Sequence, residues 1–449
     1  MNQENQAPNP PDSPSPADRY EDERNRYYWR NLISCVLVES LWGFACAMVA
    51  TTTIMAVFLE KLGATKTIIG GYPGAVLLAF AVLQIPAARW TARMPRRLGL
   101  YIALHLLPCF SWLAIAWFAY AWGLSRPQAL VWMVIGLNTL YALAVGAVIP
   151  MWLELSNRFF PDRRRGQAYG LMTMGIGLCG SLGAWYAQHE LDRLPFPVGF
   201  ARIFLIAGLV MIAGILLYLP CKEAVPPETP LPPERKSYLA WLWTRYGSDR
   251  RLMHFIVSRY LFETGASAGV FYAVYAIDRF HMSVGAAGTF TLLTNLARAV
   301  FSPTLGHMGD RRGYRRVTAW GMIFASCSTL AAILAGSGEW FYLVFIFQAI
   351  LFNGDVIGVQ NLLIEMCPGE DKTPYSAIFN TVMMPARFAA PVLAGVIADR
   401  WSIPLVFWIG LALQTLGWVY MLAFVDDPRR PGRRVLATAL ARVNDLKPW

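Results

Sequence analysis

Charged side chains are scarce in this sequence. Asp, Glu, Lys and Arg make up 15% of its 449 residues, whereas an average soluble domain carries roughly 25%. Hydrophobic residues make up 56%, and the mean hydropathy is +0.40. This composition excludes a disordered chain, which needs high charge and few apolar residues, and it argues against a soluble enzyme.

Cysteine and histidine are also few. The seven cysteines form no Cys-x-x-Cys pair and most lie in apolar runs, so neither a disulfide framework nor a metal site is expected. The five histidines are scattered, which argues against the reactive cluster of an integral-membrane enzyme. The first apolar run begins at Leu32 and is too long for a signal peptide. We therefore expect no cofactor, no metal and no catalytic residues.

Long apolar runs are what the sequence has in abundance. They are continuous rather than alternating, which favours membrane-spanning helices over barrel strands. A span needs about 20 apolar residues, and the chain has room for twelve. The predicted spans are 32–59, 67–88, 98–122, 128–154, 167–188, 201–220, 252–277, 284–305, 317–336, 340–364, 375–398 and 403–425.

The positive charge sets an orientation. The net charge of +11 could suggest a nucleic-acid partner, but the arginines lie in short clusters between apolar runs. Most of the 39 Lys and Arg residues fall in segments on the side of the N-terminus. Positive residues are enriched in cytoplasmic loops, so both termini are predicted to be cytoplasmic. The chain is predicted to lie in a bacterial inner membrane and to bind no nucleic acid.

Proline and polar segments divide the chain into two halves. Residues 1–31 are predicted to be a disordered cytoplasmic tail, and 426–449 a second tail. Residues 221–251 contain Pro226-Pro227, Pro230 and Pro232-Pro233, followed by an aromatic stretch, and read as a stiff linker with a short interfacial helix. The resulting six-helix bundles, 32–220 and 252–425, form the duplicated unit expected of a transporter.

One loop carries a family resemblance. The segment Gly306-His-Met-Gly-Asp310-Arg311-Arg-Gly313-Tyr-Arg315-Arg316 resembles the signature loop of the major facilitator superfamily. The resemblance implies two pseudo-symmetric six-helix bundles, with this segment acting as a gating loop. It also implies that the loop meets the start of helix 5 near Arg165 and latches the cytoplasmic side closed.

Other family patterns are missing. Helix 4 has no arginine where proton-coupled drug exporters of the superfamily carry one, and helix 5 lacks their proline, so a drug exporter is disfavoured. The run Gly175-Ile-Gly177-Leu-Cys-Gly180 matches a dinucleotide-binding fingerprint, but no strand precedes it. Small residues there are interpreted as helix packing in lipid.

Ionisable residues inside a bilayer are costly and usually face a protein interior or an aqueous cavity. The resemblance implies that helices 1, 4, 7 and 10 line the cavity and that 2, 5, 8 and 11 flank it, and the polar residues follow this division. The candidate substrate and proton cavity comprises Glu39, Asn138, Tyr141, Arg259, Glu263, Asn295, Arg298, Asn353, Asp355, Asn380 and Arg387.

The charged members of this set allow three interpretations. They could form a structural ion-pair network, they could bind substrate or carry a coupling proton, or some could lie nearer the interface than estimated. Arg259 and Glu263 are spaced to pair on one helix face. Glu263 and Glu39 are the first candidates for the titrating carboxylate, with Asp355 third.

These features predict a secondary transporter that moves a small organic solute by alternating access, coupled to protons and acting as a monomer. The alternative is a membrane sensor or scaffold on the same fold, whose cavity never alternates. The buried arginines suggest an anionic or zwitterionic solute, but the equal number of buried acids weakens that argument. The identity of the solute and the direction of its movement stay open.

Overall fold

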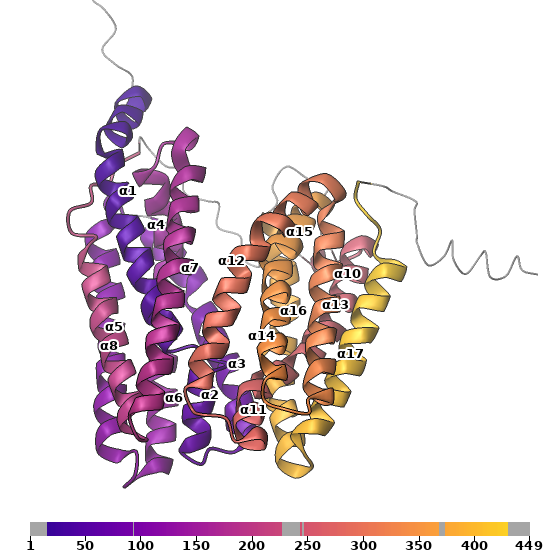
Figure 1. Ribbon diagram of the computed structural model, residues 1–449. Helices are drawn as coiled ribbons and strands as arrows, with labels where there is room; N and C mark the ends of the chain where they lie inside the picture. The colour runs from indigo at the N-terminus through magenta and orange to yellow at the C-terminus, as the bar shows by residue number, and fades with distance from the viewer. Residues whose placement is uncertain (1–15, 93, 227–242, 245–246, 368–372, 430–449) are drawn as a thin grey trace, which may run out of the picture.

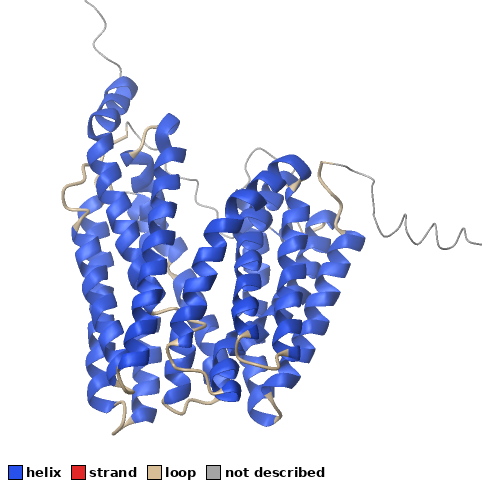
Figure 2. Cartoon of the chain, in the orientation of Figure 1, coloured by secondary structure: helices blue, strands red, loops and turns tan. Residues whose placement is uncertain are grey.

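The structure is a computed structural model that describes residues 16–92, 94–226, 243–244, 247–367 and 373–429. Helices account for nearly all of the described residues, and no strand occurs among them (Figure 2). The helices form two bundles that lie side by side (Figure 1). We call the face where α1 begins and α17 ends the terminal face, and the opposite face the distal face.

The N-terminal bundle contains the helices of the first half of the chain. Its helices are α1 (Pro16–Met48), α2 (Ile54–Lys61), α3 (Lys66–Val82), α4 (Gln84–Ala92), α5 (Leu98–Trp122), α6 (Pro127–Phe159), α7 (Asp162–Arg193) and α8 (Val198–Leu216). The pairs α1–α2 and α3–α4 each cross the bundle once, because only a short break separates their members.

The C-terminal bundle repeats this plan. It consists of α10 (Arg250–Ala266), η1 (Ser267–Phe271), α11 (Tyr272–Phe280), α12 (Ala286–Arg312), α13 (Tyr314–Leu334), α14 (Trp340–Asn353), η2 (Gly354–Val359), α15 (Gln360–Met366), α16 (Thr373–Arg400) and α17 (Ile403–Phe424). Here α10–η1–α11 and α14–η2–α15 each form one crossing with an internal irregularity.

Hydropathy supports the membrane assignment for most of these helices. Within the described ranges, nine helical segments are long and apolar enough to cross a membrane. The segments below that criterion are α7, α10–α11 and α12, which lie within the same two bundles (Figure 1). Many outward-facing side chains are large and apolar, such as Leu107 and Trp117, which are 71% and 67% exposed. The fold is therefore all-helical and fits the predicted arrangement of two six-helix bundles.

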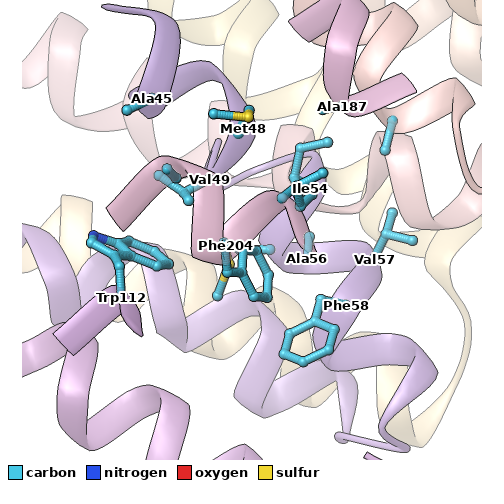
Figure 3. Close-up of a cluster of buried hydrophobic side chains, with 14 of the residues drawn as sticks. Ala45, Met48, Val49, Ile54, Ala56, Val57, Phe58, Trp112, Ala187 and Phe204 are labelled. Carbon is cyan, nitrogen blue, oxygen red and sulfur yellow. The ribbon is translucent and has the colours of Figure 1, made fainter. Parts of the chain in front are cut away.

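The core of the N-terminal bundle surrounds the break between α1 and α2. Figure 3 shows Met48, Val49 and Ile54 at this break, with Phe58 and Phe204 packed nearby. The rings of Phe58 and Phe204 meet edge to face with centroids 5.0 Å apart, a favoured aromatic geometry. Burial of these side chains holds the interrupted first span in one position.

Two predicted boundaries are wrong. Residues 16–31, predicted to be disordered, form the first turns of α1, and Tyr28 is buried there against Phe160. The eighth span, predicted to end at 305, continues as α12 to Arg312, so most of the signature segment is helical. Its one sharp turn is Gly313, whose φ of 88° is easily adopted only by glycine.

The remaining boundary predictions stay predictions. The proposed interfacial helix and most of the linker lie outside the described residues, as do residues 1–15 and nearly all of the second tail. The glycine-rich segment 175–180 lies inside α7 and not after a strand. Gly175 there contacts Ser40 of α1 so closely that an added Cβ would lie 2.2 Å from its Oγ. This close contact agrees with the packing interpretation.

Candidate functional site

Four charged side chains of the C-terminal bundle form one connected network. Arg259 donates from Nη2 to Glu263 Oε1 at 2.9 Å and to Asp355 Oδ1 at 2.8 Å. Arg387 donates from Nε and Nη2 to the two oxygens of Glu263, each at 3.1 Å. Its third nitrogen, Nη1, donates to Asn380 Oδ1 at 3.1 Å. The network joins α10, η2 and α16, three helices far apart in the sequence.

The exposure of the network is uneven. The Arg259 side chain is 1% exposed and that of Glu263 is 14% exposed, whereas Asp355 and Arg387 are 41% and 26% exposed. The two acids formally balance the two arginines. Arg259 Nε and Nη1 are nevertheless buried without a hydrogen-bond partner. Arg259 therefore has hydrogen-bond donors that no described residue accepts, beside the partly exposed carboxylates of the network.

An irregular helix places Asp355 in this network. The segment η2, in the middle of the tenth predicted span, forms a π-helical turn that begins at Gly354. Such turns shift the following side chains around the helix axis and often occur at functional sites. Gly354 lies against Gly321 of α13, where an added Cβ would meet the glycine backbone at 2.8 Å. A larger residue would push η2 away and displace Asp355.

A second group of predicted residues lies on α12 and α14 near this network. Arg298 stacks its guanidinium over the Phe352 ring, 3.5 Å from the centroid. Asn353 donates from Nδ2 to the backbone oxygen of Arg298 at 3.0 Å. Asn295, one helical turn away on α12, lies opposite Gly180 of α7. The contact with Gly180 places Asn295 where the two bundles meet, whereas the contacts of Arg298 lie within the C-terminal bundle.

The predicted residues of the N-terminal bundle do not join the network. Glu39 forms no hydrogen bond or ion pair with any residue that the structure describes. Asn138 is 4% exposed, and its Nδ2 is buried without a partner. Tyr141 packs inside its own bundle, stacked against Trp42, with its hydroxyl 3.7 Å from Met211 Sδ. Sequence periodicity does not distinguish the cavity face of such a helix from the face within its bundle.

Contacts that join the two bundles lie in the distal half of the molecule. Asp399 of α16 accepts from the backbone nitrogens of Lys66 and Thr67 at the start of α3, at 2.7 and 2.8 Å. The hydroxyls of Thr53 and Thr291 lie 2.7 Å apart, both buried. Toward the terminal face the bundles diverge (Figure 1). Sequence patterns indicated none of these five residues, because their partners are far away in the chain.

The expected latch between the signature segment and helix 5 is not formed in this structure. Asp310 accepts from the hydroxyl of Tyr314 at 2.6 Å, within its own bundle. Arg165 donates instead to Asp162 at 2.5 Å. The separation of the bundles at the terminal face leaves the two segments with local partners. This contact therefore stays a prediction, for a conformation other than the one described here.

One further residue of the signature segment, Arg315, contacts the end of another helix. Arg315 is buried and donates from Nη2 to the backbone oxygens of Met421 and Leu422 in the last turn of α17. Arg311 and Arg316 are exposed, and Gly306 has open space around its Cα. A cation at a helix C-terminus is favourable because the last carbonyls are otherwise unpaired.

Each bundle also carries an acid at its terminal face. Glu154 of α6 accepts from Arg158 at 3.2 Å, and Glu365 of α15 accepts from Arg429 at 2.5 Å. Glu223, after α8, accepts from the backbone nitrogens of Arg97 and Leu98 and thus caps α5. These contacts hold the terminal ends of helices within one bundle. Among the described residues, no group of three His, Cys, Asp or Glu could hold a metal ion.

A curated gallate transporter from Pseudomonas putida is 27% identical to this chain over 210 residues. The match covers 45% of this chain and 42% of that transporter, so the chain spans less than half of its curated relative.

Solved transporter structures share the fold across almost the whole chain. The nucleoside transporter NupG has a TM-score of 0.71, with 11% identity, 88% of this chain covered and 100% of that one. A D-xylose-proton symporter has a TM-score of 0.68, with 14% identity and coverages of 90% and 99%. At these identities, the likeness concerns the fold alone.

The profile of the Major Facilitator Superfamily matches residues 40–293 and 261–447, which together span both bundles. This match agrees with the paired helical bundles, the membrane-spanning hydropathy and the signature segment before Gly313. The chain is therefore a multi-pass membrane protein that belongs to the Major Facilitator Superfamily.

Proposed function

We propose that this chain is a secondary transporter that moves a small organic solute by alternating access. The observation that carries the proposal is the uneven contact between the bundles. Hydrogen bonds at Asp399 and at Thr53 join them in the distal half, while they diverge toward the terminal face. With both termini in the cytoplasm of a bacterial inner membrane, this conformation is closed outside and open inside. Closure of the terminal face would complete the cycle.

The second conformation would bring the signature segment to helix 5. Asp310 and Arg165 each hold a partner within their own bundle, and both contacts involve side chains that can rotate. Contacts at a helix start are worth about 0.3–2 kcal/mol, which biases an equilibrium between two states without locking it. This exchange of partners is the gating step of the proposal.

Glu263 is the first candidate for the coupling proton site. Its two oxygens hold Arg259 and Arg387 on two different helices. A relative movement of α10 and α16 would remove one of these cations, and a carboxylate that loses a neighbouring cation binds a proton more readily. Glu39, which has no ion-pair partner among the described residues, is the second candidate. Protonation would then follow conformation.

The test is solute-driven proton movement in proteoliposomes loaded with a pH-sensitive dye. Gallate is the first solute to examine, because a curated relative is a gallate transporter. We expect an added solute to move protons with it, and both Glu263→Gln and Glu39→Gln to reduce that movement. Glu339→Gln is the matched control, since Glu339 is exposed and lies outside the network.

Two results would contradict parts of the proposal. Solute flux that ignores a pH gradient, unchanged in both carboxylate variants, would refute proton coupling. Single cysteines introduced at each face measure access: labelling that stays open at the terminal face and blocked at the distal face, with and without solute, would refute alternating access. The second result would instead favour a sensor or scaffold on this fold.

A further inference from the structure

Arg298 is a membrane-embedded cation with no counter-ion among the residues that the structure describes. The arginines of the network, Arg259 and Arg387, each pair with a carboxylate. Within the described part of the chain, the Arg298 guanidinium forms neither an ion pair nor a hydrogen bond, and its Nε is buried without a partner. At 1.5 Å per residue, it lies about 18 Å along α12 from the distal end. An unpaired charge at such a depth is costly and marks a functional site.

The side chain is held in place even though its donors are unused. Its guanidinium lies 3.5 Å from the centroid of the Phe352 ring, a distance that allows a strong cation–π contact. Asn353 fixes the backbone of the same residue through a hydrogen bond to its oxygen. Stacking uses the flat face of a guanidinium and leaves the N–H groups at its edge free. The stacking thus fixes the position of the Arg298 guanidinium and leaves hydrogen-bond donors available at its edge.

The position of Arg298 follows from the face of α12 that carries it. Thr291 on this helix meets Thr53 of the N-terminal bundle, with 2.7 Å between the hydroxyls. One turn further, Asn295 Nδ2 would lie 3.4 Å from a Cβ added at Gly180 of α7. Arg298 is the next residue along this stripe, on the side where the bundles diverge (Figure 1). It therefore lies just beyond the last of these contacts between α12 and the N-terminal bundle.

Arg298 also lies next to the ion-pair network. Phe352, which supports its guanidinium, is one helical turn before Asp355 on the continuous α14–η2 segment. Phe352 is 42% exposed, and the Asp355 side chain is 41% exposed. A solute that reaches Asp355 would therefore pass close to Arg298. Because the network itself is formally neutral, Arg298 leaves this region with one excess positive charge.

We propose that Arg298 binds the carboxylate of the transported solute, with the Asn295 amide as a neighbouring polar contact, and that the solute class is therefore organic carboxylates. A carboxylate matches the edge of a guanidinium with two parallel hydrogen bonds, and it would neutralise the cation during passage. This inference rests on the proposed transport function, whose solute it specifies.

The test compares carboxylates with their neutral amides. Purified full-length chain is titrated by calorimetry with benzoate and benzamide, nicotinate and nicotinamide, and succinate and succinamide. We expect at least one carboxylate to bind the wild-type chain, and its amide to bind at least about tenfold more weakly. Arg298→Gln should weaken carboxylate binding by a similar factor, and Arg298→Lys by less, because lysine keeps the charge but not the fork.

Arg279→Gln is the matched control, since it removes the same charge from an exposed residue at the end of α11. Equal binding of acids and amides, or no carboxylate binding to the wild-type chain, would overturn the inference. So would wild-type affinity in Arg298→Gln, or loss of folding in both Arg298 variants, which would show a structural role.

Transport measurements separate this inference from the proposed function. A chain that binds a carboxylate through Arg298 but moves none across proteoliposomes would refute transport and leave the binding site intact. A chain that transports at the wild-type rate after Arg298→Gln would refute the binding site and leave transport intact.

Discussion

At Glu263, a single carboxylate holds two guanidinium groups from different helices. Its spacing from Arg259 on α10 makes one contact local, while the contact with Arg387 spans 124 residues. Breaking a buried ion pair by removing one partner is costly, because the other charge is left uncompensated. Substitution of Glu263 is therefore expected to lower the stability of the chain, whether or not this residue also carries the coupling proton.

We predict that Glu263→Gln lowers the stability of the chain by about 3 kcal/mol, since it replaces the carboxylate shared by Arg259 and Arg387 with a neutral amide. Thermal unfolding in detergent measures the change, with Glu339→Gln as the control. The double variant Glu263→Gln, Arg387→Gln should recover part of the loss. An unchanged melting temperature in the single variant would show that water, and not Glu263, compensates these arginines.

Where two helices approach closely, the contact also limits the size of single residues. Gly146 of α6 lies directly against α3, and a Cβ added there would be 2.0 Å from the Phe80 backbone oxygen. Gly136 lies on the same helix with nothing within 4 Å of such an atom. Small residues allow this close approach of helices in a membrane.

We therefore predict opposite outcomes for the same substitution at these two positions. Gly146→Ala should destabilise the chain by about 1–3 kcal/mol, the usual range for overpacking. Gly136→Ala should be neutral or stabilise it by up to about 1 kcal/mol, because alanine favours helix. Thermal unfolding of both variants provides the comparison, and equal melting temperatures would refute the assigned packing of α3 on α6.

At the scale of elements, the first turns of α1 are tied to the α6–α7 connection. Arg24 donates from Nη2 to the backbone oxygen of Phe160 and, at 2.8 Å, to Asp162. The Arg164 guanidinium lies 5.0 Å from the Tyr28 ring centroid. These contacts explain why a strongly charged segment is helical and docked. The composition of this segment predicted disorder because it contains no apolar run.

The hydrogen bond between Arg24 and Asp162 makes the stability of this element depend on pH. The hydrogen bond from Arg24 lowers the pKa of Asp162, which lies between the predicted spans 128–154 and 167–188. A lowered pKa means that the stabilisation is complete above the unfolded value of about 3.9 and is lost as the pH falls through the folded value. The side chain is 77% exposed, so the contribution is small.

Hydrogen–deuterium exchange of residues 18–28 tests the contact between Arg24 and Asp162 in the pH range where its stabilisation is complete. Protection in the wild-type chain should be constant between about pH 5 and pH 8 once intrinsic rates are removed, because Asp162 is ionised throughout that range. Arg24→Ala should raise exchange in this segment across the whole range and leave α13 unchanged. Equal exchange in the variant and the wild-type chain would show that α1 is helical without its tie to Asp162.

At the scale of the whole molecule, the distal contacts hold one conformation. Thr53 lies at the break between α1 and α2, and Thr291 on α12, so their contact joins the two bundles. A disulfide requires Cβ atoms about 3.5–4.5 Å apart, and hydroxyls 2.7 Å apart place the two side chains in direct contact. A covalent bond here would keep the distal side closed.

We predict that Thr53→Cys, Thr291→Cys forms a disulfide on oxidation and loses solute transport in proteoliposomes. Reduction should restore transport, and the single variant Thr53→Cys should be insensitive to oxidation. Mass spectrometry verifies the bond. Transport at the wild-type rate by the cross-linked chain would refute the requirement that the bundles separate on the distal side.

The residues that sequence patterns placed successfully are those with local partners. The spacing of Arg259 and Glu263 predicted their pairing, because residues four apart share one helix face. The Asp310 latch is a conformation-dependent contact, and the signature segment by itself does not specify which conformation is present. Tyr141 shares the polar pattern of its helix, yet it packs within its bundle against Met211.

The sequence by itself determined the membrane-spanning character, the division into two halves and the family, because hydropathy, charge clusters and the signature segment are local properties of the chain. Only the tertiary structure decided that Arg387 joins Glu263 and that Arg298 stacks on Phe352, with no counter-ion in the described part of the chain. Such contacts depend on the rotation of each helix about its axis and on which bundle face meets which. Packing of the whole chain sets both, and no single segment of the sequence specifies either of them.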